Sequence, residues 1–210
     1  MDPYRLPMFP LGTPLVPGSL LPLQIFELRY QQMMNDVLAA SEPEFGVVLI
    51  ERGHEVGGGD IRSMCGTVAR IVDTQVAPDG RRMVLALGIR RLRVHEWQPD
   101  QPYPVALVAD WPDITTAEID STEVNRLFDV VIEVNSLFEK LGGPVLPVAD
   151  IELSADASFA SFQLVALAPI GPSDRQRLLA CEDPVSRLEM LELALSDVEA
   201  ACRFRLQVND

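Results

Sequence analysis

The sequence predicts an α+β protein, in which a small curled β-sheet or barrel with one packed helix is followed by a helical bundle. Three observations lead to this prediction. Apolar residues make up 48% of the 210 residues, which is typical of a folded globular chain. The first half consists of short β-like runs separated by proline and glycine. In the second half, apolar residues recur at steps of three and four, as they do in amphipathic helices.

The chain opens with two expected strands and a helix. Residues 5–9 and 20–26 are apolar runs separated by turn signals such as Pro17-Gly18. Residues 27–40 carry a rough helical stripe, so we expect a helix there that closes the sheet. Five prolines within residues 7–22 oppose the apolar helix of a secretion signal.

The middle of the first half predicts further strands. Residues 45–51 form a continuous apolar run, which is typical of a strand covered on both faces, and residues 103–111 form another strand. Residues 65–97 predict a hairpin around Pro78-Asp79-Gly80, because proline presets φ and glycine accepts positive φ.

The second strand of this hairpin carries apolar residues at alternate positions. We expect Met83, Leu85, Leu87 and Ile89 to share the inward face. Leu92 and Val94 continue the inward pattern, but at even-numbered instead of odd-numbered positions. We therefore expect a bulge near Arg90-Arg91, where one extra residue would shift the alternation.

The character of the chain changes after Pro112. We expect a β domain at 1–112, a polar linker at 113–120 and a helical domain at 121–210. Asp120 is expected to open the first helix of that domain, which should end at Gly142-Gly143. Further helices are expected at 157–168, from Ser173 as a cap, and from Asp183 as N-cap with Pro184 at the first helical position.

Charge and composition exclude several classes of function. The net charge of −14 argues against nucleic acid and against anionic membranes, because phosphate binding needs clustered positive charge. No segment reaches the roughly 18 unbroken apolar residues that a membrane span needs. Three cysteines without a CxxC spacing indicate a reducing compartment, so we expect a cytoplasmic protein. His54 and His95 are the only histidines and lack ligand spacing, so no metal or cofactor is expected.

Two sequence blocks resemble the Lon protease N-terminal domain family. The first is residues 9–34, FPLGTPLVPGSLLPLQIFELRYQQMM, with Pro-Leu-Gly, a proline-glycine turn, an apolar strand and Ile-Phe-Glu-x-Arg-Tyr at the start of a helix. The second is residues 65–94, with a Gly-x-x-Ala/Val strand, the Pro-Asp-Gly hairpin and a strand ending in Gly-x-x-Arg-x-Arg. Together they cover about the first 112 residues, and the helical remainder resembles the segment after that domain more loosely.

This resemblance implies a PUA-like β pseudo-barrel followed by a helical bundle. It also implies recognition of protein substrates without catalysis, since the ATPase and peptidase modules of a full Lon protease would need a longer chain. The Gly171-Pro172-Ser173 triplet looks similar to the surroundings of the Lon peptidase serine, but Asp174 follows it. The sole lysine, Lys140, lies upstream of that serine, so we expect no peptidase dyad.

We therefore expect a stand-alone, non-catalytic module that binds peptides or unfolded segments of other proteins and could act as an adaptor. It should be a monomer or a weak homodimer. The expected site is a groove between the barrel and the helical half. Its candidate residues, including one from the glycine-rich loop 52–60, are Phe26, Tyr30, Met33, Met34 and His54. For Phe26, Tyr30 and Met34, packing onto the sheet is the competing interpretation.

A second hypothesis is a PUA-like small-molecule or nucleic-acid binder, which rests on fold analogy alone. It requires one positive patch built from Arg81, Arg82, Arg90, Arg91 and Arg93. If these guanidinium groups pair with carboxylates or point to different sides, that hypothesis loses its support.

Overall fold

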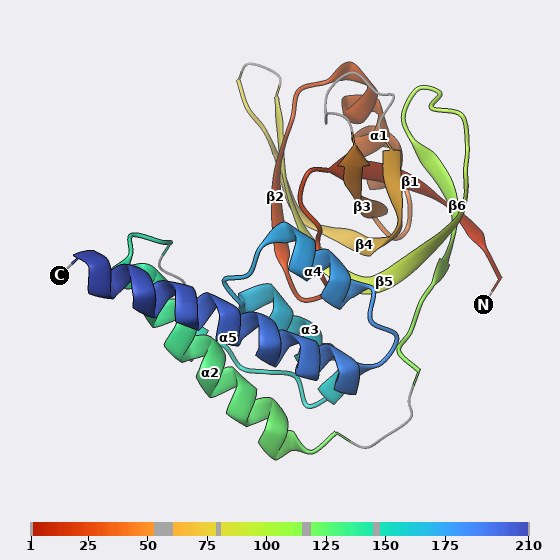
Figure 1. Cartoon of the computed structure of the whole chain (residues 1–210). Helices are drawn as coiled ribbons and strands as arrows, with labels where there is room; N and C mark the ends of the chain where they lie inside the picture. The colour runs from red at the N-terminus through yellow and green to blue at the C-terminus, as the bar shows by residue number, and fades with distance from the viewer. Residues whose placement is uncertain (1, 53–60, 79–80, 115–118, 145–147, 210) are drawn as a thin grey trace. The chain divides into compact units, whose positions relative to one another are not determined.

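The computed structural model describes residues 2–52, 61–78, 81–114, 119–144 and 148–209. The chain divides into two compact units, Met1–Pro112 and Asp113–Asp210. Strands dominate the first unit and helices the second, so the protein is of the α+β class (Figure 1).

The first unit is a six-stranded sheet with one helix, as far as the structure describes it. Its elements, in chain order, are β1 (Tyr4–Leu11), β2 (Leu20–Ile25), α1 (Leu28–Leu38), β3 (Glu44–Arg52), β4 (Ile61–Val76), β5 (Arg82–Trp97) and β6 (Val105–Asp110). The predicted strands and the predicted helix therefore form close to where the sequence places them. The antiparallel pairing of the predicted hairpin is also confirmed, because β4 and β5 pair from Cys65–Arg93 to Val76–Arg82, while Asp79 and Gly80 of the expected turn lie outside the described residues.

The sheet closes on itself. The strand order is β2-β5-β4-β3-β1-β6, and β6 also pairs with β5. Strand β5 pairs with two strands in succession along one edge. Its first half pairs with β2 and its second half with β6. Strands β5, β4, β3, β1 and β6 thus form a closed ring, and β2 adds to it with a single strand neighbour.

Two apolar clusters pack on opposite faces of the sheet, because neighbouring residues of one strand, such as Met8 and Phe9, belong to different clusters. In the first, the buried face of α1 packs against β1–β5, and the Phe9 and Tyr30 rings lie with their centroids 4.3 Å apart. The second joins the inner faces of β1, β3, β4, β5 and β6 around residues such as Met8 and Leu92. The glycine at position 66 is required here, because a Cβ at that position would lie 2.2 Å from the Val47 carbonyl oxygen.

The expected inward face of β5 is wrong for its first half. Val84 and Ala86 are buried, whereas Met83, Leu85 and Leu87 lie on the opposite, more exposed face. A register shift does occur, between Gly88 and Arg90, close to the expected bulge. Val84 and Ala86 face the cluster to which α1, β1 and β3 supply large side chains, so β5 contributes small ones there.

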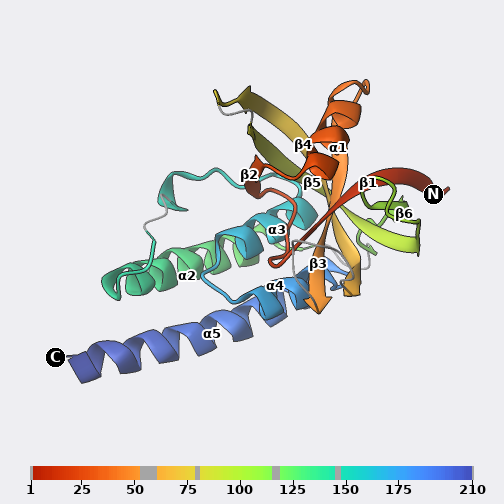
Figure 2. The same cartoon turned by 90° about the horizontal axis from the view of Figure 1, so that it is seen from above.

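The second unit consists of α2 (Ser121–Lys140), a short 3₁₀ helix η1 (Val148–Asp150), α3 (Ala157–Leu167), α4 (Pro172–Leu179) and α5 (Pro184–Asn209). Helices α2 and α5 lie side by side, α3 contacts both, and α4 packs on α3 and α5 (Figure 2). Helix α5 buries one face, on which Leu188, Leu191, Leu195 and Cys202 lie.

Side-chain caps fix most of these helix starts. Asp120 accepts a hydrogen bond from the Thr122 N–H, and Asp183 accepts one from the Ser186 N–H. The expectation for Ser173 is wrong, because the N-cap of α4 is Gly171 and Ser173 lies inside the first turn after Pro172.

A buried ion pair ties the start of the second unit to its helices. The Arg187 guanidinium donates to Asp113 at 2.5 and 2.9 Å and to the Ser161 hydroxyl at 2.7 Å. It also lies 3.5 Å from the centroid of the Phe162 ring. Asp113, which the sequence places in a linker, is thus anchored between α3 and α5, and the Ser158 hydroxyl donates to it as well.

Candidate functional site

An exposed apolar surface lies on the outer face of β2 and β5. Leu20 stands opposite Leu87, Pro22 opposite Leu85, and Gln24 opposite Met83. Residues directly opposite one another in an antiparallel pair point to the same side of the sheet, so these side chains share one face. We call the five apolar residues among them the outer strip: Leu20, Pro22, Met83, Leu85 and Leu87.

Several of these apolar side chains are strongly exposed. Leu20 is 61% exposed and Met83 45% exposed, while Leu85 and Leu87 are half-buried. Phe26 follows β2 by one residue, continues its alternation and is 58% exposed. A contiguous exposed apolar patch on a folded protein marks a site of interaction. The outer strip with Phe26 is therefore the candidate binding surface of the first unit.

The open edge of β2 offers few backbone groups for strand addition. The Gly88 N–H donates to the Ser19 carbonyl, and the Gly88 carbonyl accepts from the Gly18 N–H. Gly88 and every second residue before it in β5 therefore direct their backbone N–H and C=O groups towards β2. By alternation, Leu20, Pro22 and Gln24 direct their backbone groups away from β5. Pro22 has no N–H in the middle of this edge. A partner would thus bind the strip through side-chain contacts.

The structure distributes the predicted site residues between surface and core. Phe26 is on the surface beside the outer strip. Tyr30 is 4% exposed, and Met33 and Met34 are fully buried, so these three side chains hold α1 against the sheet and do not line an open groove. His54 lies outside the described residues. Sequence reasoning missed the outer strip, although β5 carries apolar residues on both faces and only one face can point inward.

The arginines of β5 do not form a common positive patch. Arg82 donates to the Asn35 side chain. Arg91 is buried, donates to the Trp111 carbonyl, and shares the Trp111 ring with Arg93, whose guanidinium lies 4.0 Å from the ring centroid. Arg90 forms ion pairs with Glu44 at 2.8 Å and with Asp110 at 2.9 Å. The condition set for a nucleic-acid surface is therefore not met.

The cluster around Arg90 is instead a structural network at the closure of the ring. Burial opposes ionisation of Glu44, but hydrogen bonds from Arg90 and Arg70 outweigh it and hold the Glu44 pKa below its ordinary value. Burial, together with the hydrogen bond to Asp110, raises the pKa of Tyr4 to about 12. These groups satisfy one another, since the Tyr4 hydroxyl donates to Asp110 at 2.6 Å and accepts from Arg90.

The described residues contain no cluster of three or more histidine, cysteine, aspartate or glutamate side chains that would hold a metal ion. Within the same part of the chain, no helix combines the length and apolar character needed to cross a membrane.

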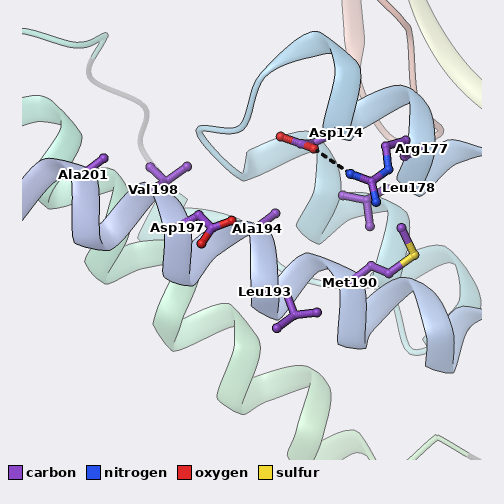
Figure 3. A pocket seen from close by; sticks show the side chains of 9 residues that line it. All are labelled: Asp174, Arg177, Leu178, Met190, Leu193, Ala194, Asp197, Val198 and Ala201. Carbon is purple, nitrogen blue, oxygen red and sulfur yellow. Dashed lines mark hydrogen bonds and ion pairs between the residues drawn. The ribbon is translucent and has the colours of Figure 1, made fainter.

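The helical unit has a concave surface of its own. A groove of about 440 Å³ lies between α4 and α5, with Leu178, Ala194 and Val198 among its apolar lining (Figure 3). Asp174 and Arg177 form an ion pair at its rim, with 3.4 Å between the nitrogen and the oxygen.

Comparisons with known proteins identify the relatives of this chain. Residues 5–197 match the family model of the ATP-dependent protease La (LON) substrate-binding domain. A Lon protease of Cytophaga hutchinsonii is 27% identical over 203 residues, which are 94% of this chain and 25% of that protein. A LON peptidase N-terminal domain and RING finger protein of Schizosaccharomyces pombe is 24% identical over 212 residues, covering 88% of this chain and 43% of that protein.

A solved structure gives the same result. The crystal structure of a Lon N-terminal domain protein from Xanthomonas campestris superposes with a TM-score of 0.67 at 28% identity and covers 90% of this chain and 98% of its own. The chain thus spans a quarter of the Cytophaga protease and nearly the whole Xanthomonas domain protein. The matched domain of Lon binds substrates and is non-catalytic, while the protease activity of Lon lies in other domains. Since the family model covers most of its length, this chain belongs to the Lon substrate-binding domain family.

Proposed function

We propose that this protein is a non-catalytic module that binds apolar segments of unfolded proteins through the outer strip and Phe26. The observation that carries the proposal is the exposure of this apolar surface in a member of a substrate-binding family. Leu20, Met83 and Phe26 lose the most exposed apolar area when they are covered, and burial contributes roughly 25 cal/mol per Å². Partners rich in leucine and aromatic residues would gain most from this contact.

The structural setting of this surface supports recognition of side chains rather than of one backbone conformation. We propose that the first unit is a PUA-like pseudo-barrel, a proposal that the closed ring of β5, β4, β3, β1 and β6 supports. The second unit is proposed to be a helical bundle domain. In this arrangement, the ring holds the outer strip rigid, and the protein acts as an adaptor that presents bound segments to other components in the cytoplasm.

A binding assay tests the proposal. Fluorescein-labelled, reduced and carboxymethylated α-lactalbumin is a permanently unfolded probe, and its anisotropy reports binding. We expect Leu20→Ser combined with Phe26→Ser to weaken binding by roughly tenfold or more, since two exposed anchors of about 1 kcal/mol each are removed.

The matched control is Ile114→Ser, which removes an exposed side chain of similar size in the other unit. Equal binding by the double variant, the control and the parent would refute the proposed surface. The RNA-binding alternative is not favoured, because the arginines that would carry it have partners within the protein.

A further inference from the structure

Helix α5 has a second apolar face that nothing in the described part of the chain covers. Leu193, Phe204 and Val208 are 69%, 67% and 68% exposed. At 3.6 residues per turn they fall on one stripe, nearly opposite the buried face that includes Leu195 and Cys202. An isolated surface helix has a polar outer face, so the apolar outer face of α5 indicates a docking surface.

The groove between α4 and α5 borders this stripe. The α5 side of the groove includes the small residues Ala194 and Ala201, and Leu193 belongs to both the groove and the stripe, while Asp197, one turn after Leu193, also lines the groove (Figure 3). Its volume of about 440 Å³ exceeds that of a phenylalanine side chain, so the groove has room for an inserted aromatic ring. The stripe therefore provides both protruding side chains and a hollow that fits them.

Two charged residues on the same face identify the occupant. Asp197 and Arg205 are exposed, and neither has an ion pair or a hydrogen bond among the described residues. Arg203, by contrast, pairs with both Glu199 and Glu133. Asp197 and Arg205 are eight residues apart, too far along one helix to pair with each other. Together they offer one charge of each sign to a partner.

We propose that this face binds a second copy of the same chain, with the two α5 helices antiparallel and the two-fold axis at Ala201. In that register residue numbers that face each other sum to 402, which places Asp197 of one copy opposite Arg205 of the other. Val208 then faces Ala194 and Phe204 faces Val198, so both bulky side chains enter the groove of the partner copy. An isologous contact repeats each of these pairs twice.

The small side chains at the axis allow the two helices to approach closely. Ala201 lies at the crossing point and Ala200 beside it. The apolar pairs and the charge pairs then lie on both sides of the axis. From Leu193 to Val208 the stripe is about 22 Å long at 1.5 Å per residue. A contact confined to this one stripe is expected to be weak, with a dissociation constant on the order of 10 µM.

Sedimentation equilibrium of the full chain at physiological salt, from about 5 to about 500 µM, tests the dimer. The apparent mass should rise with concentration from 23.2 kDa towards twice that value. Phe204→Glu should weaken association by about 100-fold or more, because it places a carboxylate in the partner's apolar groove. Ile114→Glu, at another exposed apolar position of the same unit, should leave it unchanged. A monomer at every concentration, or a dimer that survives Phe204→Glu, overturns the proposal.

Charge reversal tests the antiparallel register. Asp197→Arg alone and Arg205→Asp alone should each weaken the dimer by about tenfold, because like charges then face each other across the axis. The double variant restores opposite charges in both pairs and should recover the parent affinity. Failure of the double variant to recover overturns the register. These results are independent of the outer strip, since loss of unfolded-protein binding in the Leu20 and Phe26 variant would leave the dimer intact.

Discussion

Removal of the Arg187 guanidinium is the perturbation whose effect on stability the structure defines most fully. The Arg187 side chain is completely buried, and its nitrogens donate to Asp113, to Ser161 and to the carbonyls of Leu178 and Cys181. Arg187→Ala would leave the carboxylate of Asp113 buried without its counter-charge. Removing one partner of a buried pair costs about 3–5 kcal/mol. Asp113 keeps the hydrogen bond from Ser158, so we expect about 4 kcal/mol, in the middle of that range.

The two units allow the effect to be assigned to one of them. Both tryptophans, Trp97 and Trp111, lie in the first unit, whereas most helical residues lie in the second. Urea unfolding followed by circular dichroism at 222 nm therefore reports mainly on the helical unit, and tryptophan fluorescence reports on the strands. With a urea dependence of about 1.5 kcal/mol per M for a unit of this size, Arg187→Ala should lower the dichroism midpoint by about 2.5 M.

A paired variant controls for lost packing. Arg187→Met combined with Asp113→Leu replaces both charges by apolar side chains of similar length, which is often neutral for a buried ion pair. We expect this double variant to unfold within about 2 kcal/mol of the parent. A dichroism midpoint that falls by less than about 0.5 M in Arg187→Ala would refute the reasoning, because the buried pair would then contribute little to the unit.

Two further predictions concern the first unit. Folding lowers the Glu44 pKa below its ordinary value of 4.5, so the stability from this carboxylate is present above that pH and lost as the pH falls below it. Glu44→Gln should therefore lower the fluorescence midpoint at pH 7 and flatten its fall between about pH 5 and pH 3; an unchanged pH profile would contradict this. Gly66→Ala should cost about 3 kcal/mol or more by the same measurement, because its Cβ would meet the Val47 carbonyl. Gly171→Ala, whose Cβ has no neighbour within 4 Å, is the matched control in the dichroism measurement, and an equal loss in both variants would contradict the steric argument.

The sequence was sufficient to predict the order and type of the main elements because the spacing of apolar residues differs between strands and helices. Strands such as β3 are continuous apolar runs, and α2 repeats apolar residues at helical spacing between Asp120 and Gly142. Local chemistry also predicted where helices begin, as at Asp183. These features depend on residues close together in the chain.

The face that each element buries depends on distant residues and could not be predicted in the same way. β5 has apolar residues on both faces, and the larger ones were expected inside. The face of β5 that packs against α1 is instead covered by Phe9, Met33 and Met34 from other elements, which leaves Met83 and Leu87 on the opposite, more exposed face as part of the candidate site. Arg187 is a similar case, since it resembles a solvated residue of a helix until folding brings Asp113 to it from 74 positions away.

The most direct test of the central claim is photo-cross-linking from the outer strip itself. A p-benzoylphenylalanine replaces Leu20, a strongly exposed residue of the outer strip, or Ile114, an exposed site in the other unit. Each protein is irradiated with labelled, carboxymethylated α-lactalbumin, and the covalent product is measured on a denaturing gel. We expect a strong product from position 20 that excess unlabelled unfolded chain competes away, and little product from position 114. Equal products from the two positions, or none from position 20, would show that unfolded segments do not bind the outer strip.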